Sequence, residues 1–180
     1  MYTKKHMNLF QIRTLTWAAM CLALCLVLPF LTGQIPQIGS ALCPMHLPVL
    51  LAGFLCGPWW ALLVGITAPL LRHILFSMPP LLTAIAMSFE LAAYGTVSGL
   101  MYRKLKTNLT GIYLSLIAAM ITGRILWGIV MVLITGATGT TFTWAMFLAG
   151  ALTNAVPGIL LQLILIPILV TALKKANYIR

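Results

Sequence analysis

The feature that most constrains this chain is a series of long apolar stretches that carry almost no charge. Its 180 residues include a single acidic side chain, Glu90, and 62% of the residues are hydrophobic. A water-soluble domain of this length exposes many more charged residues. A stretch that crosses a bilayer must satisfy its own backbone hydrogen bonds, and a helix of roughly 20 residues does so. The sequence therefore predicts an all-α integral membrane protein, with residues 1–180 forming one transmembrane domain.

Polar breaks divide the apolar sequence into six segments. Glycine and proline lie at several of these breaks, for example at Gly57-Pro58, where a helix ends readily. The second segment is short for a hydrocarbon core of about 30 Å, whereas the sixth is longer than this thickness needs. We expect six transmembrane helices at about residues 13–31, 45–56, 59–76, 81–101, 109–135 and 142–173.

The basic residues predict how these helices are oriented. The formal net charge is +10, but the positive residues gather at helix ends and do not form a nucleic-acid-binding patch. Six crossings bring three basic clusters to one side, and such clusters favour the cytoplasmic side. We therefore predict a multi-pass protein of the plasma membrane with both termini in the cytoplasm. The clusters contain Lys4, Lys5, Arg13, Arg103, Lys104, Lys106, Lys174, Lys175 and Arg180.

Few residues are available for catalysis or metal binding. The four cysteines include no CxxC pair, and Cys43, His46 and His73 lack the spacing of a metal site. One carboxylate provides little for general acid–base catalysis, and the sequence contains no phosphate-binding loop. The sequence therefore predicts no catalytic residues, no metal and no bound cofactor.

Three polar side chains fall at a similar depth inside the predicted helices. A rise of about 1.5 Å per residue places Glu90 about 14 Å below the outer end of its helix, Arg124 about 16 Å and Asn154 about 18 Å. Arg72 and His73 lie nearer the outer surface, at about 5 Å. Charged residues inside a membrane helix mark a functional site or a buried pair.

These charges allow more than one interpretation. Glu90 and Arg124 either neutralise each other and brace the bundle or contact a ligand. Arg72 has no carboxylate left to pair with, so we expect it to bind an anion from solvent, from a lipid phosphate or from a ligand. Trp127 lies one turn from Arg124 and forms either a wall of a ligand pocket or ordinary core.

Pairs of small residues four positions apart allow neighbouring helices to approach closely. Such pairs pack helices within the bundle or, in the first helix above all, dock another membrane subunit. The pairs are Ala19 and Ala23, Gly53 and Gly57, and Gly95 and Gly99.

Several segments together resemble the substrate-binding S components of energy-coupling factor (ECF) vitamin transporters. They are AAMCLA at 18–23, CPMHLPVLLAGFLCGP at 43–58, APLLR at 68–72, MPP at 78–80 and FELAAYG at 89–95. The resemblance covers nearly the whole chain and implies six helices with both termini inside. It also implies a pocket near the extracellular side that holds a water-soluble vitamin or precursor and is covered by the connection 32–44.

The same resemblance implies partners. A transmembrane T component and two cytosolic ATPases would use ATP to topple the S component and release substrate inside, and Ala19 and Ala23 would belong to the docking face. Two arginines against one carboxylate favour an anionic vitamin such as pantothenate, while pyridoxine, a thiamine precursor and niacin stay open. The polar layer falls where the pocket of this family lies, so the candidate substrate-binding residues are Arg72, Glu90, Arg124, Asn154, Trp127, His46 and His73.

Two functions of other classes also stay open. A small intramembrane enzyme acting on a lipid would need Glu90 or His73 as its base, and these differ in depth by about 9 Å. A scaffold subunit would use its charges only to form pairs. In that case, substitution of Arg72 or Arg124 would change the folding yield but no ligand response.

Overall fold

The computed structural model describes residues 9–32, 35, 41–105 and 108–178. Within these residues the structure is helical and contains no strand. In chain order the elements are α1 (Leu9–Val27), the 3-10 helix η1 (Leu28–Thr32), α3 (His46–Cys56), α4 (Pro58–Phe76), α5 (Leu81–Lys104), α6 (Leu109–Ala137), α7 (Trp144–Leu148), the π-helical turn η2 (Ala149–Thr153) and α8 (Val156–Lys175).

Most of these helices have the length and the surface of membrane spans. Large apolar side chains face outward, including Leu133 at 66% and Ile164 at 62% exposure, as lipid contact requires. The structure confirms the all-α membrane class. The second predicted span, α3, has 11 residues and is about 16 Å long, too short to cross alone. Five described stretches are long and apolar enough to cross: Ile12–Leu31, Pro58–Phe76, Leu81–Lys104, Leu109–Ala137 and Trp144–Lys175.

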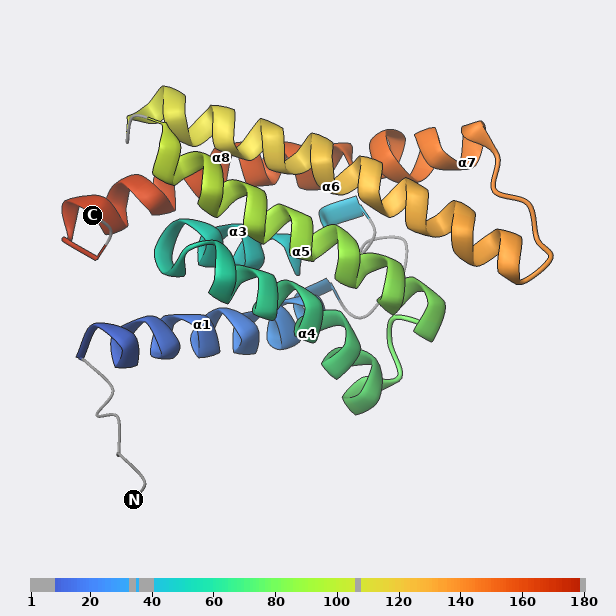
Figure 1. Ribbon diagram of the computed structural model, residues 1–180, viewed down its shortest axis with the longest axis horizontal. Coiled ribbons are helices and arrows are strands. Elements are labelled where there is room, and N and C mark those ends of the chain that lie inside the picture. The colour runs from blue at the N-terminus through green and yellow to red at the C-terminus, as the bar shows by residue number, and fades with distance from the viewer. Residues whose placement is uncertain (1–8, 33–34, 36–40, 106–107, 179–180) are drawn as a thin grey trace, which may run out of the picture.

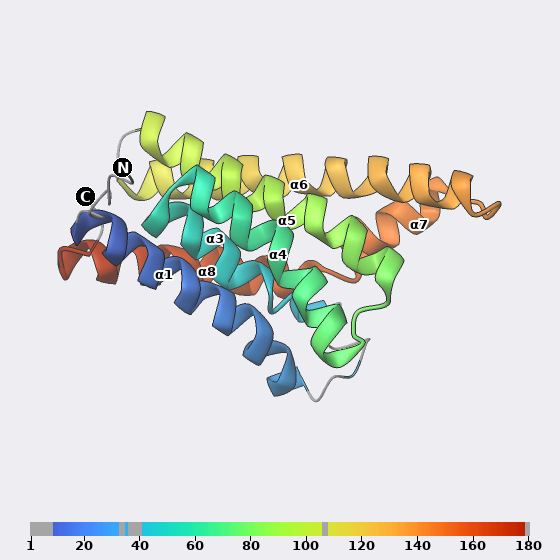
Figure 2. The same cartoon turned by 60° about the horizontal axis from the view of Figure 1, so that its bottom comes forward.

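The helices form an elongated bundle with two different ends. Figures 1 and 2 show the start of α1 and the end of α8 at the same end, together with the α5–α6 connection. We call the opposite end, which holds η1 and the α4–α5 turn, the pocket end. The cytoplasmic location of the termini stays a prediction, and Lys4, Lys5, Lys106 and Arg180 lie outside the described residues.

Local sequence signals explain where several helices begin and end. Gly57 adopts a φ of 86°, which a side chain would strain, and Pro58 is the first residue of α4. The side chain of Asn108 accepts a hydrogen bond of 2.9 Å from the Gly111 amide and caps α6. These residues therefore fix the α3–α4 corner and the start of α6.

Close contact between α3, α4 and α5 forms the core of the bundle. Gly95 lies against the backbone of Ala61, and Gly53 lies against Ser98 and the Gly95 carbonyl. A methyl group at either glycine would overlap these atoms, which cannot all move away. Gly99 packs in the same way against the α3–α4 corner. The two glycine pairs therefore pack helices inside the bundle.

The small residues of α1 behave differently. Ala18, Cys21 and Cys25 point into the core and are almost fully buried. Ala19 and Ala23 lie on the exposed side of the same helix. This pair is therefore not used for packing within the described chain and is accessible to another membrane protein.

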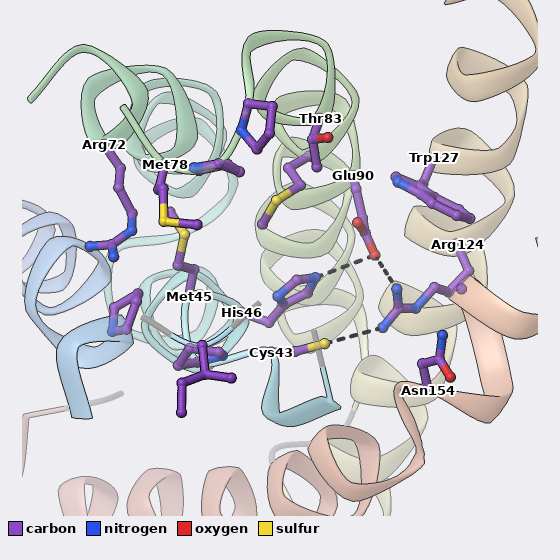
Figure 3. Close-up of a pocket in the computed structure, with 17 residues that line it drawn as sticks. Cys43, Met45, His46, Arg72, Met78, Thr83, Glu90, Arg124, Trp127 and Asn154 are labelled. Atoms are coloured by element: carbon purple, nitrogen blue, oxygen red, sulfur yellow. Dashed lines mark hydrogen bonds and ion pairs between the residues drawn. The ribbon is translucent and has the colours of Figure 1, made fainter. Parts of the chain in front are cut away.

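The predicted sixth helix, 142–173, is broken in the structure. The Asn154 amide donates to the Ala149 carbonyl at 2.9 Å, a π-type bond that ends the first part. Pro157 lies in the first turn of α8, where its missing N–H is tolerated. The break between α7 and α8 leaves Asn154 in the wall of a cavity, beside Arg124 (Figure 3).

Candidate ligand-binding site

A cavity of about 410 Å³ lies at the pocket end, within the size range of small-molecule sites. Its wall comes from η1, the segment before α3, the start of α3, α4, the α4–α5 turn, α5, α6 and the α7–α8 break. Six of the candidate residues line it: His46, Arg72, Glu90, Arg124, Trp127 and Asn154.

Glu90 is at the centre of the polar side of this cavity. Its Oε1 lies 2.9 Å from Arg124 Nη1 and 3.3 Å from His46 Nε2. Arg124 Nη2 also donates to the Cys43 thiol at 3.7 Å. Figure 3 shows these side chains converging from α3, α5, α6 and the segment before α3. Glu90 and His46 are each only 2% exposed, so the charges depend on one another rather than on water.

Tyr94, one turn after Glu90, supports this arrangement. Its fully buried ring meets the His46 ring edge-on, with the centroids 5.0 Å apart. The same ring lies against Gly123 of α6, where a methyl group would overlap it. The absence of a side chain immediately before Arg124 therefore lets α6 approach α5 closely enough for the ion pair.

The polar cluster contains more donors than acceptors. Glu90 is the only acidic side chain of the sequence, whereas Arg124 carries several N–H donors and no acceptor. The Nε–H donor of Arg124 is buried and has no hydrogen-bond partner among the described residues. Carboxylate or carbonyl oxygens of a bound molecule would supply the acceptors that the cluster lacks.

Trp127 and Asn154 extend the wall beside Arg124. The Trp127 ring stacks on Phe147, with the centroids 6.2 Å apart, and meets Phe142 edge-on at 5.8 Å. Gly150 of η2 lies directly against the indole. The tryptophan is thus both a lining residue and part of an aromatic cluster, and its role in ligand binding stays a prediction.

Arg72 lines the cavity, its described partners are not carboxylates, and the expectation that it binds an anion stays a prediction. Its Nη1 donates to the Leu26 carbonyl at 2.6 Å. The guanidinium carbon lies 5.0 Å from the centre of the Phe30 ring and 5.4 Å from that of Phe76. A helix carries partial negative charge at its C-terminal carbonyls, and aromatic faces attract cations. The final turn of α1 and the two rings therefore offset the arginine charge.

His73 is not one of the described residues that line the cavity. Its Nδ1 lies 2.8 Å from the Pro79 carbonyl oxygen, which can only accept. The ring nitrogen is therefore the donor, and His73 holds the α4–α5 turn.

Sequence reasoning missed much of the apolar side of the cavity. Met45, Met78 and Met87 line it, and methionine adapts readily to the shape of a ligand. Thr83 and Met87 precede Glu90 by seven and three residues and share its face of α5. Helical periodicity counted back from Glu90 could have found both. The binding roles of all these residues stay predictions.

The cavity has no arrangement suited to a metal. The described residues contain no group of three His, Cys, Asp or Glu side chains that could hold a metal ion. All four cysteines are described and carry thiols, and three of them lie in the apolar core away from the cavity.

Comparisons with known proteins identify the family. Neither the curated proteins nor the solved structures contain a match. A family model described as the substrate-specific component of ECF transporters matches residues 13–170, which include every residue that lines the cavity. This is a family of transporter substrate-binding subunits and not of enzymes. The chain therefore belongs to the substrate-specific components of ECF transporters.

Proposed function

We propose that this chain captures a water-soluble vitamin or vitamin precursor in the cavity around Glu90 and Arg124. The chain is a multi-pass plasma-membrane protein of a transporter family. In this proposal it acts with a transmembrane T component and two cytosolic ATPases. ATP hydrolysis by these partners topples the subunit and releases the substrate into the cytoplasm.

The observation that carries the proposal is a buried, donor-rich polar cluster on one side of an otherwise apolar cavity. Arg124 and His46 approach the single carboxylate of Glu90, and the buried Nε–H of Arg124 remains for a ligand. Apolar walls exclude water and strengthen the hydrogen bonds that a small polar ligand makes. Arg72 adds a second positive charge to the wall.

This charge balance favours an anionic ligand of the pantothenate type. A carboxylate can accept two parallel hydrogen bonds from one guanidinium, a geometry that a point charge does not provide. Pyridoxine, a thiamine precursor and niacin are the competing candidates. All three contain an aromatic ring that pantothenate lacks, and only niacin shares its carboxylate charge.

The first test is a thermal-shift screen of the detergent-purified chain against these vitamins and precursors. One compound should raise the melting temperature at micromolar concentration, because a hundredfold excess over Kd stabilises the folded state by about 2.7 kcal/mol. Arg124→Gln is the matched control and should abolish the shift. A flat panel with folded protein would contradict the proposal.

Docking to the T component is tested separately. Ala19 and Ala23 lie on the exposed side of α1, and leucine at both positions would prevent close helix approach there. We expect the double variant to lose co-purification with the T component and ATPases while the vitamin-induced thermal shift remains. Met20→Leu, at an exposed neighbour of similar volume, should retain both properties.

A further inference from the structure

Two covering segments of the cavity are tied to the same end of α4. The first is η1, from which Pro29 lines the cavity, and the second is the α4–α5 turn, from which Met78 and Pro79 line it. The residues that tie them, Arg72 and His73, are neighbours in the sequence. Neighbouring residues point about 100° apart around a helix, so one position on α4 reaches two different segments.

Arg72 makes three contacts with the first segment and its surroundings. It donates to the Leu26 carbonyl at 2.6 Å, immediately before η1, and its guanidinium faces the rings of Phe30 in η1 and Phe76 in α4. The two rings also meet each other edge-on, with the centroids 5.0 Å apart. Arg72 is only 3% exposed, and this cluster joins η1 to α4.

His73 makes the equivalent contact with the second segment. Its ring N–H donates to the Pro79 carbonyl at 2.8 Å, between two residues that line the cavity. The Ser77 amide donates to the His73 carbonyl at 2.7 Å and closes the last turn of α4. The backbone and the side chain of His73 therefore both fix the α4–α5 turn.

We infer that Arg72 and His73 form a clasp that holds these two segments over the cavity. They are positioning residues, which set how easily a small molecule enters and leaves the cavity rather than which charge it carries. The inference rests on the proposed binding function for its biological meaning. Its test needs no vitamin. A vitamin screen without a hit would therefore count against the proposed function but would not decide whether the clasp exists.

The cavity contains a built-in reporter for this test. Cys43 lines the cavity and is 7% exposed, while Cys21, Cys25 and Cys56 are core residues outside it. A thiolate that reaches a methanethiosulfonate forms a mixed disulfide and releases methanesulfinate. Peptide mass spectrometry of the full chain in nanodiscs measures the rate at Cys43 separately from the other thiols.

Two reagents of similar size distinguish a clasp from a charge effect. One carries a trimethylammonium group and the other a sulfonate group. In Arg72→Met both rates at Cys43 should rise on the order of tenfold, because the variant loses a charged hydrogen bond and two cation–π contacts. In Phe30→Leu, which changes no charge, both rates should rise and their ratio should stay unchanged, since an open clasp admits both reagents alike.

The remaining variants test whether the result for Arg72→Met comes from a general loosening of the helix bundle or from failure of that variant to fold. Phe30→Leu removes only a partly exposed ring and should raise both rates in the same way. His73→Ala should do so as well, whereas His73→Asn, which can still donate to Pro79, should restore the slow rate. Arg13 makes matching contacts at the opposite end of the bundle, with the Tyr178 carbonyl at 2.8 Å and the Tyr178 ring at 5.6 Å.

Arg13→Met therefore controls for the loss of such contacts far from the cavity and should leave the Cys43 rates unchanged. The inference is overturned if Arg72→Met and Phe30→Leu leave both rates at the level of the natural chain. It is also overturned if the only change in Arg72→Met is a slower reaction of Cys43 with the sulfonate reagent, because Arg72 then acts on anions directly. An equal increase in Arg13→Met would assign the effect to general loosening and also reject the clasp.

Discussion

Arg72 and Arg124 are two arginines in the wall of one cavity, yet different partners hold them. Arg124 lies 2.9 Å from the Glu90 carboxylate. Arg72 instead donates to the Leu26 carbonyl and lies over two phenylalanine rings. The comparison teaches that a buried guanidinium can be held by a carboxylate, as in Arg124, or by a helix C-terminus and aromatic faces, as in Arg72.

The two settings differ in what the removal of each arginine leaves behind. Loss of Arg124 leaves Glu90 buried with only His46 beside it, which is an incompletely compensated charge. Loss of Arg72 leaves a neutral carbonyl and two rings, none of which is charged. The same substitution is therefore expected to have very different consequences at the two positions.

The largest expected effect is the loss of stability in Arg124→Gln. Breaking one side of a buried ion pair costs about 3–5 kcal/mol, whereas Arg72→Gln removes a hydrogen bond to a neutral carbonyl and should cost about 1–3 kcal/mol. Unfolding of the two purified variants in one detergent, followed by circular dichroism, measures the difference. Equal losses of stability in the two variants would show that the surroundings of Arg72 and Arg124 hold the two charges equally strongly, against the difference described above.

A second variant sharpens the assignment of this cost to Glu90. In the double variant Glu90→Gln with Arg124→Gln, two neutral amides replace the ion pair and can hydrogen-bond to each other. We expect about 1–3 kcal/mol of the stability lost in Arg124→Gln to return, because the buried charge is gone. The same unfolding measurement applies. A double variant no more stable than Arg124→Gln would show that Glu90 is not the source of the penalty.

A third effect concerns ligand charge. If Arg124 binds the carboxylate of a vitamin, the natural chain should prefer the acid over its amide by about tenfold or more, since hydrogen bonds to charged groups contribute about 1.5–3 kcal/mol. Arg124→Gln should lose this preference, and Arg72→Gln should keep it. Equilibrium binding of the acid and the amide to the three proteins measures the ratio. Loss of the preference in Arg72→Gln would return Arg72 to the role of an anion-binding residue.

The sequence predicted the membrane class and most helices because apolar length and helix-ending residues are local signals. It also placed Glu90, Arg124 and Asn154 in one layer, since helical rise converts sequence position into depth. Around the same cavity the structure brings these three residues together with Trp127 and His46. The apolar side was harder to predict, because methionines of the cavity and methionines of the core look alike in a sequence.

The partners of Arg72 and His73 could not be predicted for a different reason. Both side chains bind backbone carbonyls, of Leu26 and Pro79, and every residue carries a carbonyl. Counting carboxylates therefore suggested an unpaired arginine. The break after η2 was equally hidden, since 142–173 reads as one apolar segment. Asn154 and Pro157 mark the break no more clearly than Gln162 and Pro167, which lie inside α8.

The smallest expected effect is that of His73→Ala on ligand affinity. His73 is not among the described residues that line the cavity, and the one hydrogen bond described for its side chain holds the α4–α5 turn. Loss of that bond should speed association and dissociation together, so that Kd changes by less than about tenfold. The corresponding loss in Arg124→Gln should be larger, because Arg124 belongs to the deeper polar cluster. Stopped-flow binding to both variants measures the two rates. Equal losses of affinity would place the ligand nearer to the pocket end, against His73, and would move the binding site away from Glu90.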